Sequence, residues 1–426
     1  MLTKPQLDDH AVWKQRFRAP VVLGTLIARA NPTRVIAGAL SLAFCLAWPN
    51  VAQADIKYFP IPAISTSKND GNDFLFLLPT LITGPDGGLK YLVTPMVVYN
   101  SFVGTRGTFN LFRYEPGGKE LKGLASWSER IERKFLLSYV DPGFSNGRYS
   151  IGVSATHFKN ATLRFFGLGP TTVKGNQTNY TASETRANWK FGVYANEVTQ
   201  IAVSQRLRHM QPIQEGVTEL PFTGDEFPNV PGVDGVTILG QRVSFHYDTR
   251  DNLVTPTDGT AITAYAELNY NLRNAADPLY SRYGLELKKL FASESKRAIL
   301  VVRGDLQATL GTDVPFYELS SLGGQNNLRG VGVDRYLDKQ LLALSVEERI
   351  HVLRTRLAGV VADFEVAPFL DTGQVFHSFK NVSFKDYRIT PGIGFRGIVR
   401  PNVVGRVDCG YSKEGITAFA GLDFPY

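Results

Sequence analysis

Apolar and polar side chains alternate with a period of two along most of the chain. In residues 261–270 one face is apolar or aromatic throughout, whereas the other carries Thr263, Tyr265, Glu267 and Asn269. Such alternation is typical of a β-strand whose two faces meet different solvents. It predicts about sixteen strands of roughly ten residues, the length of a tilted membrane-spanning strand. They lie near 72–82, 88–100, 105–115, 129–140, 147–158, 183–194, 196–208, 236–248, 260–271, 280–292, 297–309, 340–352, 359–371, 387–397, 402–411 and 415–426.

The first 54 residues have the pattern of an export signal. Basic residues precede an apolar run at 35–48, and Val51-Ala-Gln-Ala54 provides a cleavage site. The run is shorter than the roughly 20 apolar residues that span a bilayer. We predict a signal peptide at 1–54 and a short periplasmic segment at 55–71; a buried N-terminal helix is the alternative.

Two all-β architectures accommodate the remaining strands. In a soluble sandwich the apolar faces meet a second sheet, whereas in an outer-membrane barrel they meet lipid and the charged faces meet a wet lumen. The chain is exported, its strands continue to the last residue, and Tyr and Phe recur near strand ends, as an interfacial girdle requires. We therefore expect an all-β fold, a transmembrane antiparallel β-barrel over residues 72–426, in the bacterial outer membrane.

Composition and charge exclude several functions. Lys and Arg number 46 against 39 Asp and Glu, and much of the resulting net charge of +7 lies before residue 55. No Lys/Arg cluster of the kind that binds nucleic acid is present. After removal of the signal peptide, Cys409 is the only cysteine, which leaves no intrachain disulfide and no cysteine metal site. We expect no cofactor, no metal and no nucleic-acid partner.

Motifs of catalysis are also missing from the sequence. It contains no G-x-S-x-G, H-E-x-x-H, Walker loop or dinucleotide fingerprint. Its six His residues lack ligand spacing, and His246, beside Ser244 and Asp248, is expected to be a solvated lumen residue. The sequence therefore predicts no catalytic residues and a protein that is not an enzyme.

One long connection stands out, from about 310 to 339, because it contains LGGQNNLRGVGVDRY at Leu322–Tyr336. With the N-terminus in the periplasm, this connection between the eleventh and twelfth predicted strands is the sixth outer loop. Its Gly-Gly and Asn-Asn pairs allow tight turns, so the loop can fold back into the lumen. Arg329 would then need a carboxylate, because an unpaired buried charge is costly. Asp371, on a charged strand face, can provide it.

The loop and the Phe369-Leu-Asp-Thr-Gly373 segment together resemble the BamA/TamA-like superfamily of outer-membrane assembly factors, also called bacterial surface antigen proteins. That family has an Arg-Gly-aromatic tip on its sixth outer loop and an F-x-D-x-G motif on strand thirteen. The resemblance implies that Arg329 pairs with Asp371 inside the lumen, in a loop–lumen latch that includes Gly330, Phe369 and Gly373. This chain departs at Val331, where the family has Phe or Tyr; an unrelated porin loop is the alternative.

Further segments resemble the family in the same order. They are Phe165–Pro170, the periplasmic turn Tyr247–Gly259 and Pro391–Phe395. At the end of the chain, Gly421, Phe424 and Tyr426 resemble the C-terminal signal that the barrel assembly machinery recognises; an ordinary last strand with a girdle is the alternative. The resemblance covers essentially all of 70–426.

Two functions are compatible with this resemblance. Relatives that insert or secrete proteins usually carry POTRA modules, but the gap between residues 55 and 72 is too short for a βαβ-sized module, so we expect the bare barrel. Pro79 in the first predicted strand and Pro425 in the last each remove a donor where the ladder must close, which predicts a loose seam. The first function is translocation or insertion of protein or lipid substrates through a lateral gate. Its partners are outer-membrane lipid, the assembly machinery that inserts the barrel and a substrate or separate periplasmic protein. The alternative is a passive or plugged channel.

Overall fold

The structure is a computed structural model that describes residues 55–58, 60–67, 71–85, 87–214, 216–272, 279–357, 360–399, 403–421 and 424–425. They all belong to one compact unit, residues 49–426. The predicted signal peptide at 1–54 and Tyr426 lie outside the described residues. No helix within these ranges is long and apolar enough to cross a membrane.

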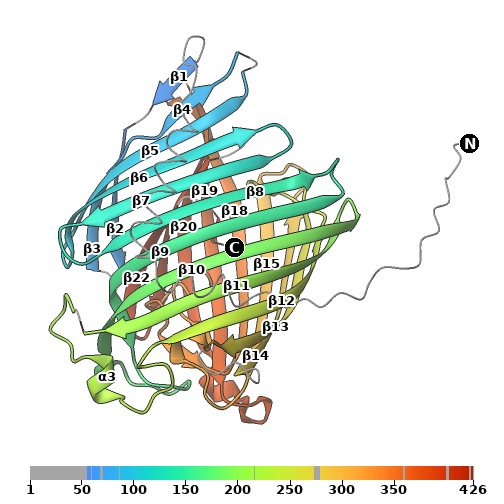
Figure 1. The fold of residues 1–426 in the computed structure, drawn as a ribbon. Helices are drawn as coiled ribbons and strands as arrows, with labels where there is room; N and C mark the ends of the chain where they lie inside the picture. The colour runs from blue at the N-terminus through green and yellow to red at the C-terminus, as the bar shows by residue number, and fades with distance from the viewer. Residues whose placement is uncertain are drawn as a thin grey trace, which may run out of the picture. The chain divides into compact units, whose positions relative to one another are not determined.

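Antiparallel strands make up nearly all of this unit, and from residue 89 onwards each strand of the main sheet pairs with the next one along the chain (Figure 1). The first ten are β1 (Asp55–Tyr58), β2 (Ile61–Ser67), β3 (Gly71–Leu77), β4 (Thr80–Thr83), β5 (Leu89–Asn100), β6 (Gly104–Glu115), β7 (Lys119–Ser128), β8 (Arg133–Phe144), β9 (Tyr149–Phe165) and β10 (Thr178–Asn196). The other wall strands are β11 (Thr199–Ile213), β12 (Val236–Asp248), β13 (Gly259–Asn271), β14 (Tyr280–Ala292), β15 (Ala298–Leu310), β18 (Gln340–Leu357), β19 (Val360–Phe376), β20 (Arg388–Val399), β21 (Val403–Ser412) and β22 (Gly415–Gly421).

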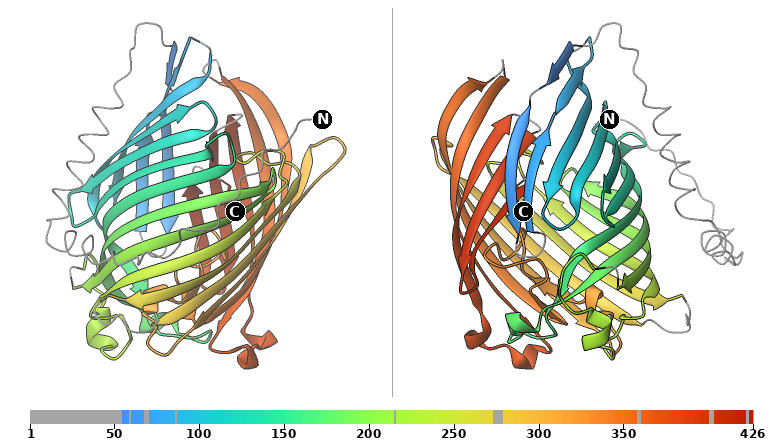
Figure 2. Two further views of the ribbon diagram at one scale, coloured as in Figure 1. Left: turned by 45° about the vertical axis from the view of Figure 1, so that its right-hand side comes forward. Right: turned by 90° about the vertical axis from the view of Figure 1, so that its left-hand side faces the viewer.

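The remaining elements lie in the connections. β16 (Ser320–Leu322) and β17 (Tyr336–Asp338) form a separate two-stranded sheet. The short helices are η2 (Lys174–Asn176), α3 (Thr223–Glu226), η3 (Phe316–Glu318), η4 (Phe379–Asn381) and η5 (Phe384–Asp386). Figures 1 and 2 show the main sheet curved into a barrel wall.

The exposure of the two strand faces is the reverse of that in a soluble protein. On β13, the apolar Leu268 is exposed, whereas its neighbours Glu267 and Asn269 are buried. Apolar side chains therefore point outwards, as they do in a wall that faces lipid, and polar side chains point into a filled lumen. The predicted transmembrane β-barrel is confirmed.

The number of strands differs from the prediction. The main sheet contains 20 strands, but β1 and β2 follow one line of the wall and β3 and β4 the next, which leaves 18 positions in the described residues. Sequence patterns missed β7, because Gly123 and Ala125 weaken its apolar face. They also missed β1 and β2, where Pro60 and Pro62 argue against a strand. The predicted periplasmic segment at 55–71 is thus largely wall, and the long loop follows the thirteenth position instead of the eleventh.

The two ends of the barrel differ in the length of their connections. The longest ones, 166–177, 214–235 and 311–339, lie at the end that carries α3, whereas the opposite end has tight turns such as 116–118 (Figure 1). Outer-membrane barrels have short periplasmic turns and long outer loops. The long loop 311–339 is therefore on the outer side, as predicted.

The ends of the sheet meet at β2 and β22, which come together in the right-hand view of Figure 2. Among the described residues this seam has a single residue pair, Thr66↔Ala418, whereas β10 and β11 share a ladder from Thr181 to Asn196. Because β2 precedes β3, Pro79 is not at the seam: it separates β3 from β4 in the second position of the wall. The predicted seam residue Pro79 therefore lies away from the place where the two ends of the sheet meet.

Candidate functional site in the barrel lumen

The loop 311–339 folds into the lumen, and its backbone is shaped for a close approach to the wall. A Cβ on Gly330 would lie 2.6 Å from Cγ2 of Thr390 and 2.9 Å from the carbonyl oxygen of Tyr411. On the facing wall, a Cβ on Gly410 would lie 2.4 Å from the carbonyl oxygen of Arg329. Only glycine at both positions permits this contact, which brings Arg329 to the inner faces of β18 to β21.

The structure places Arg329 and Asp371 together. The Arg329 side chain is completely buried, and its Nε and Nη2 donate to the two carboxylate oxygens of Asp371 at 2.8 and 2.9 Å. The backbone N–H of Arg329 donates to Asp371 as well, at 3.1 Å. Nη1 donates to Glu347 at 2.6 Å and to Asp408 at 3.3 Å. The bidentate geometry matches the planar fork of the guanidinium, so several buried charges are neutralised at once.

Further arginines complete this cluster, which we call the acidic anchor. Glu347 accepts from Arg349 at 3.0 Å and from Arg396 at 3.1 Å, and Asp408 accepts from Arg396 and Arg406, both at 2.7 Å. The anchor thus consists of three wall carboxylates, Asp371, Glu347 and Asp408, the loop's Arg329 and three wall arginines. Buried charges are tolerated only with good geometry and satisfied partners. Removal of one member therefore leaves a buried charge without its partner, and the desolvation of that charge lowers the stability of the fold.

The other predicted latch residues shape this site. The guanidinium of Arg329 lies over the ring of Phe369, 3.4 Å from its centroid. The carbonyl oxygen of Gly330 accepts from Ser412 at 2.7 Å and from Thr417 at 3.2 Å. At Gly373, a Cβ would lie 2.9 Å from the carbonyl oxygen of Leu342, so a larger residue would push the strands apart.

Val331 fills an apolar position where the family has an aromatic residue. It is 2 % exposed and belongs to a buried cluster. The cluster comprises Leu322, Leu328, Val331, Tyr336, Leu341, Ala343 and Val375. Since the loop and β18 and β19 contribute these side chains jointly, a smaller residue at this position still packs against the wall.

A second charged cluster holds the outer part of the loop, and sequence reasoning missed it. Glu318, in η3, is buried and accepts from Arg206 at 2.7 Å and from Arg282 at 3.1 Å; Arg208 also donates to it. Burial raises the pKa of Glu318, but Arg208 and Arg206 lower it by more, so its net pKa lies well below the usual range. We call Glu318 with Arg206, Arg208 and Arg282 the basic anchor.

The two anchors have opposite polarity: a loop cation binds wall carboxylates in one, and a loop carboxylate binds wall arginines in the other. The sequence contains a partial signal for the basic anchor, because Arg206 and Arg208 share one face of their strand. Their partner lies 110 residues from Arg208, so only the fold reveals it.

The predicted family segment Phe165–Pro170 holds the loop from a third side. The carbonyl oxygen of Leu337 accepts from the N–H of Gly169 at 2.8 Å, and Arg388 donates to the carbonyl oxygen of Pro170 at 2.6 Å. Phe165 packs in the apolar cluster that includes Phe316 of the loop. The segment thus connects the outer connection 166–177 to the loop 311–339.

The C-terminal residues depart from the prediction. The last strand ends at Gly421, so residues 424 and 425 do not continue the wall. The ring of Phe424 lies 3.6 Å from the guanidinium carbon of Arg349, on β18, and Pro425 is buried. Because Arg349 points into the lumen, the chain turns inwards after β22, and Phe424 is not part of a lipid-facing girdle.

The described residues were expected to show neither a Ser-His-acid triad at His246 nor a metal site. His246 contacts Ser244 at 3.0 Å and Lys190 at 3.2 Å, while Asp248 pairs with Arg250, so no Ser-His-acid set forms there. Among the described side chains, no group of three or more His, Cys, Asp or Glu could hold a metal ion.

Comparisons with known proteins agree with this geometry. The family model of the Omp85 superfamily domain matches residues 117–398. Among solved structures, BamA from Haemophilus ducreyi lacking POTRA domains 1–3 is similar, with 15 % identity, a TM-score of 0.54, and coverage of 90 % of this chain and 77 % of that one. CdiB from Acinetobacter baumannii has 11 % identity and a TM-score of 0.47, with coverage of 86 % and 65 %. No curated protein matches the sequence. The family match spans well over half of the chain, so this protein is a member of the Omp85 superfamily and a β-barrel of the bacterial outer membrane.

Proposed function

We propose that this barrel translocates or inserts protein or lipid substrates through a lateral opening at the seam between β2 and β22. The observation that carries the proposal is the length of the seam. In the part of the chain that the structure describes, its strands share one residue pair, Thr66↔Ala418, whereas β13 and β14 share a ladder from Gly259 to Asn269. Ladder hydrogen bonds and cross-strand contacts each add to cohesion, so the seam is the part of the wall that separates most easily.

The inward turn of the C-terminus supports the same opening. Residues beyond Gly421 would extend β22 along the seam, but Phe424 is instead placed on Arg349 in the lumen. The periplasmic part of β2 and β1 therefore faces no described partner strand on the seam side. An unpaired edge of this kind is a template for pairing with another strand.

The loop 311–339 has a complementary role in this proposal. Both anchors hold it inside the lumen, where it obstructs a straight route along the barrel axis. Substrates would then leave sideways, into the membrane. Outer-membrane lipid, an unfolded protein or lipid substrate and a separate periplasmic protein that delivers it are the partners that this function requires.

A disulfide across the seam tests the proposal. Thr66→Cys with Ala418→Cys, in a Cys409→Ser background, joins residues that are register partners, a separation that a disulfide spans. Oxidation is expected to reduce insertion of an unfolded outer-membrane protein in proteoliposomes at least about fivefold, and a reductant is expected to restore it. The matched control joins β13 to β14 through Ala264→Cys and Leu285→Cys and should stay active. Equal activity with the seam locked would contradict lateral opening.

The alternative function, a plugged channel without insertase activity, is favoured by the two anchors that hold the loop. Planar-bilayer conductance tests whether the lumen is plugged, whereas the insertion assay with the locked seam tests whether the barrel has insertase activity. Small flickering openings are expected for a plugged barrel, whereas large steady openings would show that the lumen is an open pore.

A further inference from the structure

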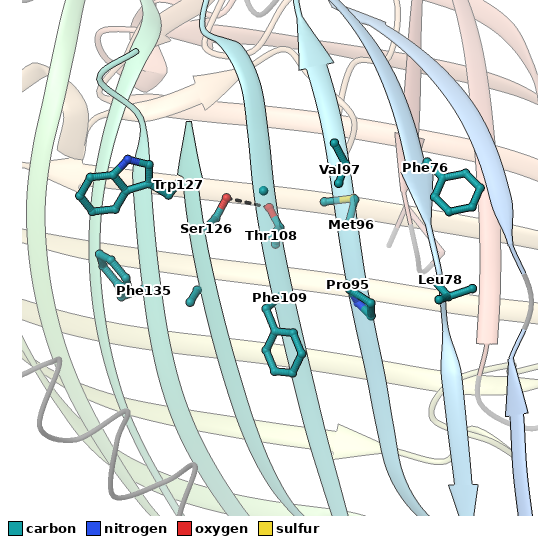
Figure 3. A pocket seen from close by; sticks show the side chains of 12 residues that line it. Phe76, Leu78, Pro95, Met96, Val97, Thr108, Phe109, Ser126, Trp127 and Phe135 are labelled. Atoms are coloured by element: carbon teal, nitrogen blue, oxygen red, sulfur yellow. Dashed lines mark hydrogen bonds between the residues drawn. The ribbon is translucent and has the colours of Figure 1, made fainter. Parts of the chain in front are cut away.

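A groove on the lipid-facing side of the wall is not used by the proposed function. It has a volume of about 540 Å³ and lies across β3, β5, β6, β7 and β8 (Figure 3). Its apolar walls are formed by Phe76, Pro95, Val97, Phe109, Trp127 and Phe135. Val97 and Trp127, which are 54 % and 50 % exposed, show that this face of the sheet points outwards. The volume is in the range of ligand sites.

Small residues create the hollow. Gly107 is the register partner of both Val97 and Trp127, and a Cβ added to it would meet no atom within 4 Å. On the lumen side of the same strands, the hydroxyls of Thr108 and Ser126 form a hydrogen bond of 2.7 Å that closes the wall behind the groove. The groove is therefore a depression in an intact wall, open to the membrane.

A cation lies at the outer end of the groove. Arg133, the first residue of β8, is exposed, and its guanidinium carbon lies 3.8 Å from the ring centroid of Trp127. Glu132, beside it, is already paired with Arg106 at 2.8 Å, and no carboxylate pairs with Arg133 in the described part of the chain. Trp127 and Arg133 border the connection on the outer side of the barrel, while Pro95 lies in the middle of β5. The groove thus runs from the outer ends of β7 and β8 towards the middle of β5.

We propose that this groove binds a phosphorylated glycolipid of the outer leaflet, of the lipid A class. An acyl chain occupies the apolar hollow between Trp127 and Pro95, and a phosphate binds Arg133. The charge of the ligand complements the arginine, since a guanidinium forms charge-assisted hydrogen bonds with phosphate and keeps its aromatic stacking. The outer position of the arginine selects a lipid whose phosphate lies at the outer surface.

Native mass spectrometry of the full-length protein titrated with lipid A measures this binding. Gly107→Leu adds a side chain to the hollow at a position where a Cβ meets no atom within 4 Å, and Arg133→Gln removes the charge but keeps a side chain against Trp127. Each variant is expected to bind lipid A about tenfold more weakly, the scale of a few lost methylene contacts or one charge-assisted hydrogen bond. Gly304→Leu is the matched control, because Gly304 is equally open and lies opposite the lipid-facing Leu287 on the other side of the barrel. Its binding should not change.

Two outcomes would overturn the proposal. Unchanged affinity of Gly107→Leu, with folding verified by the mobility of the unheated protein in gels, would exclude the groove. Equal retention of phosphatidylglycerol and lipid A, insensitive to Arg133→Gln, would show adventitious annular lipid only.

Discussion

Replacing Arg329 with alanine removes the charged group that the loop contributes to the acidic anchor. Glu347 keeps Arg349 and Arg396 as partners after this change. The carboxylate of Asp371, by contrast, keeps only the backbone N–H of residue 329 among the hydrogen bonds of the described residues. The variant therefore leaves a buried carboxylate without its charge partner, in a site where both side chains are completely buried.

The size of the effect follows from this burial. Breaking a buried pair by removing one partner costs about 3–5 kcal/mol, most of it the desolvation of the remaining charge. Asp371→Ala in the same background removes that remaining charge. The double variant should therefore be less destabilised than the sum of the single ones, with a coupling energy of about 2–3 kcal/mol.

Urea unfolding of the barrel in lipid vesicles measures these free energies, and Arg354→Ala serves as the control. Arg354 pairs with Asp363 at 2.6 Å, but its side chain is 62 % exposed, so solvent screens the pair and its loss should cost much less than the loss of Arg329. The position of the loop has its own readout. Val331→Cys, in a Cys409→Ser background, should react with a maleimide only when Arg329→Ala releases the loop. A coupling energy below about 0.5 kcal/mol, together with unchanged protection of this cysteine, would refute the role of the pair in holding the loop.

Three other changes probe the rest of the lumen. Glu318→Gln should destabilise the barrel by about 2–3 kcal/mol in urea unfolding, because it removes the negative charge that partners a cluster of buried arginines. The pKa of Glu318 lies below its usual range, so the stability that its charge contributes in the wild-type protein should persist from pH 7 down to about pH 4.5 and be lost only in stronger acid. Asp334→Asn should raise the urea midpoint at pH 8, because burial raises the pKa of Asp334 and its charged form therefore costs stability above that pKa. The gain should shrink as the pH falls through that pKa; asparagine still accepts from Ser321 and tolerates the φ of 54°. A lower midpoint for Asp334→Asn at pH 8 would show that its charge is needed. Phe424→Ala should lower the free energy of unfolding by about 1–2 kcal/mol through loss of the stacking on Arg349, and an unchanged midpoint would show that the inward turn of the C-terminus does not stabilise the barrel.

Local alternation was sufficient to identify the class of fold, because each strand of a two-solvent wall shows its faces in its own residues. Glu267 and Asn269 point into the lumen and Leu268 points outwards, as the period of two predicts. The pairing of Arg329 with Asp371 came from a family resemblance, since nothing within the loop itself names its partner. The tip residue Val331 shows the limit of that resemblance, because an apolar cluster accepts a smaller side chain there.

Other features depended on the neighbours that the fold supplies. Pro60 and Pro62 argue against a strand, yet β1 and β2 form beside the seam. On the seam side these strands have few ladder hydrogen bonds to make, so the N–H groups that proline lacks are not needed there. Glu318 became an anchor only because β11 and β14 bring Arg206, Arg208 and Arg282 to the same point of the lumen.

The sequence by itself determined an alternating, all-β chain whose outer loop carries a charge that needs a partner. The tertiary structure alone decided where the wall closes, which carboxylate meets which arginine, and that the chain turns into the lumen at Phe424. The reason is physical: the face of a strand residue depends on local periodicity, whereas strand neighbours, the seam and buried ion pairs depend on the register between segments distant in the chain.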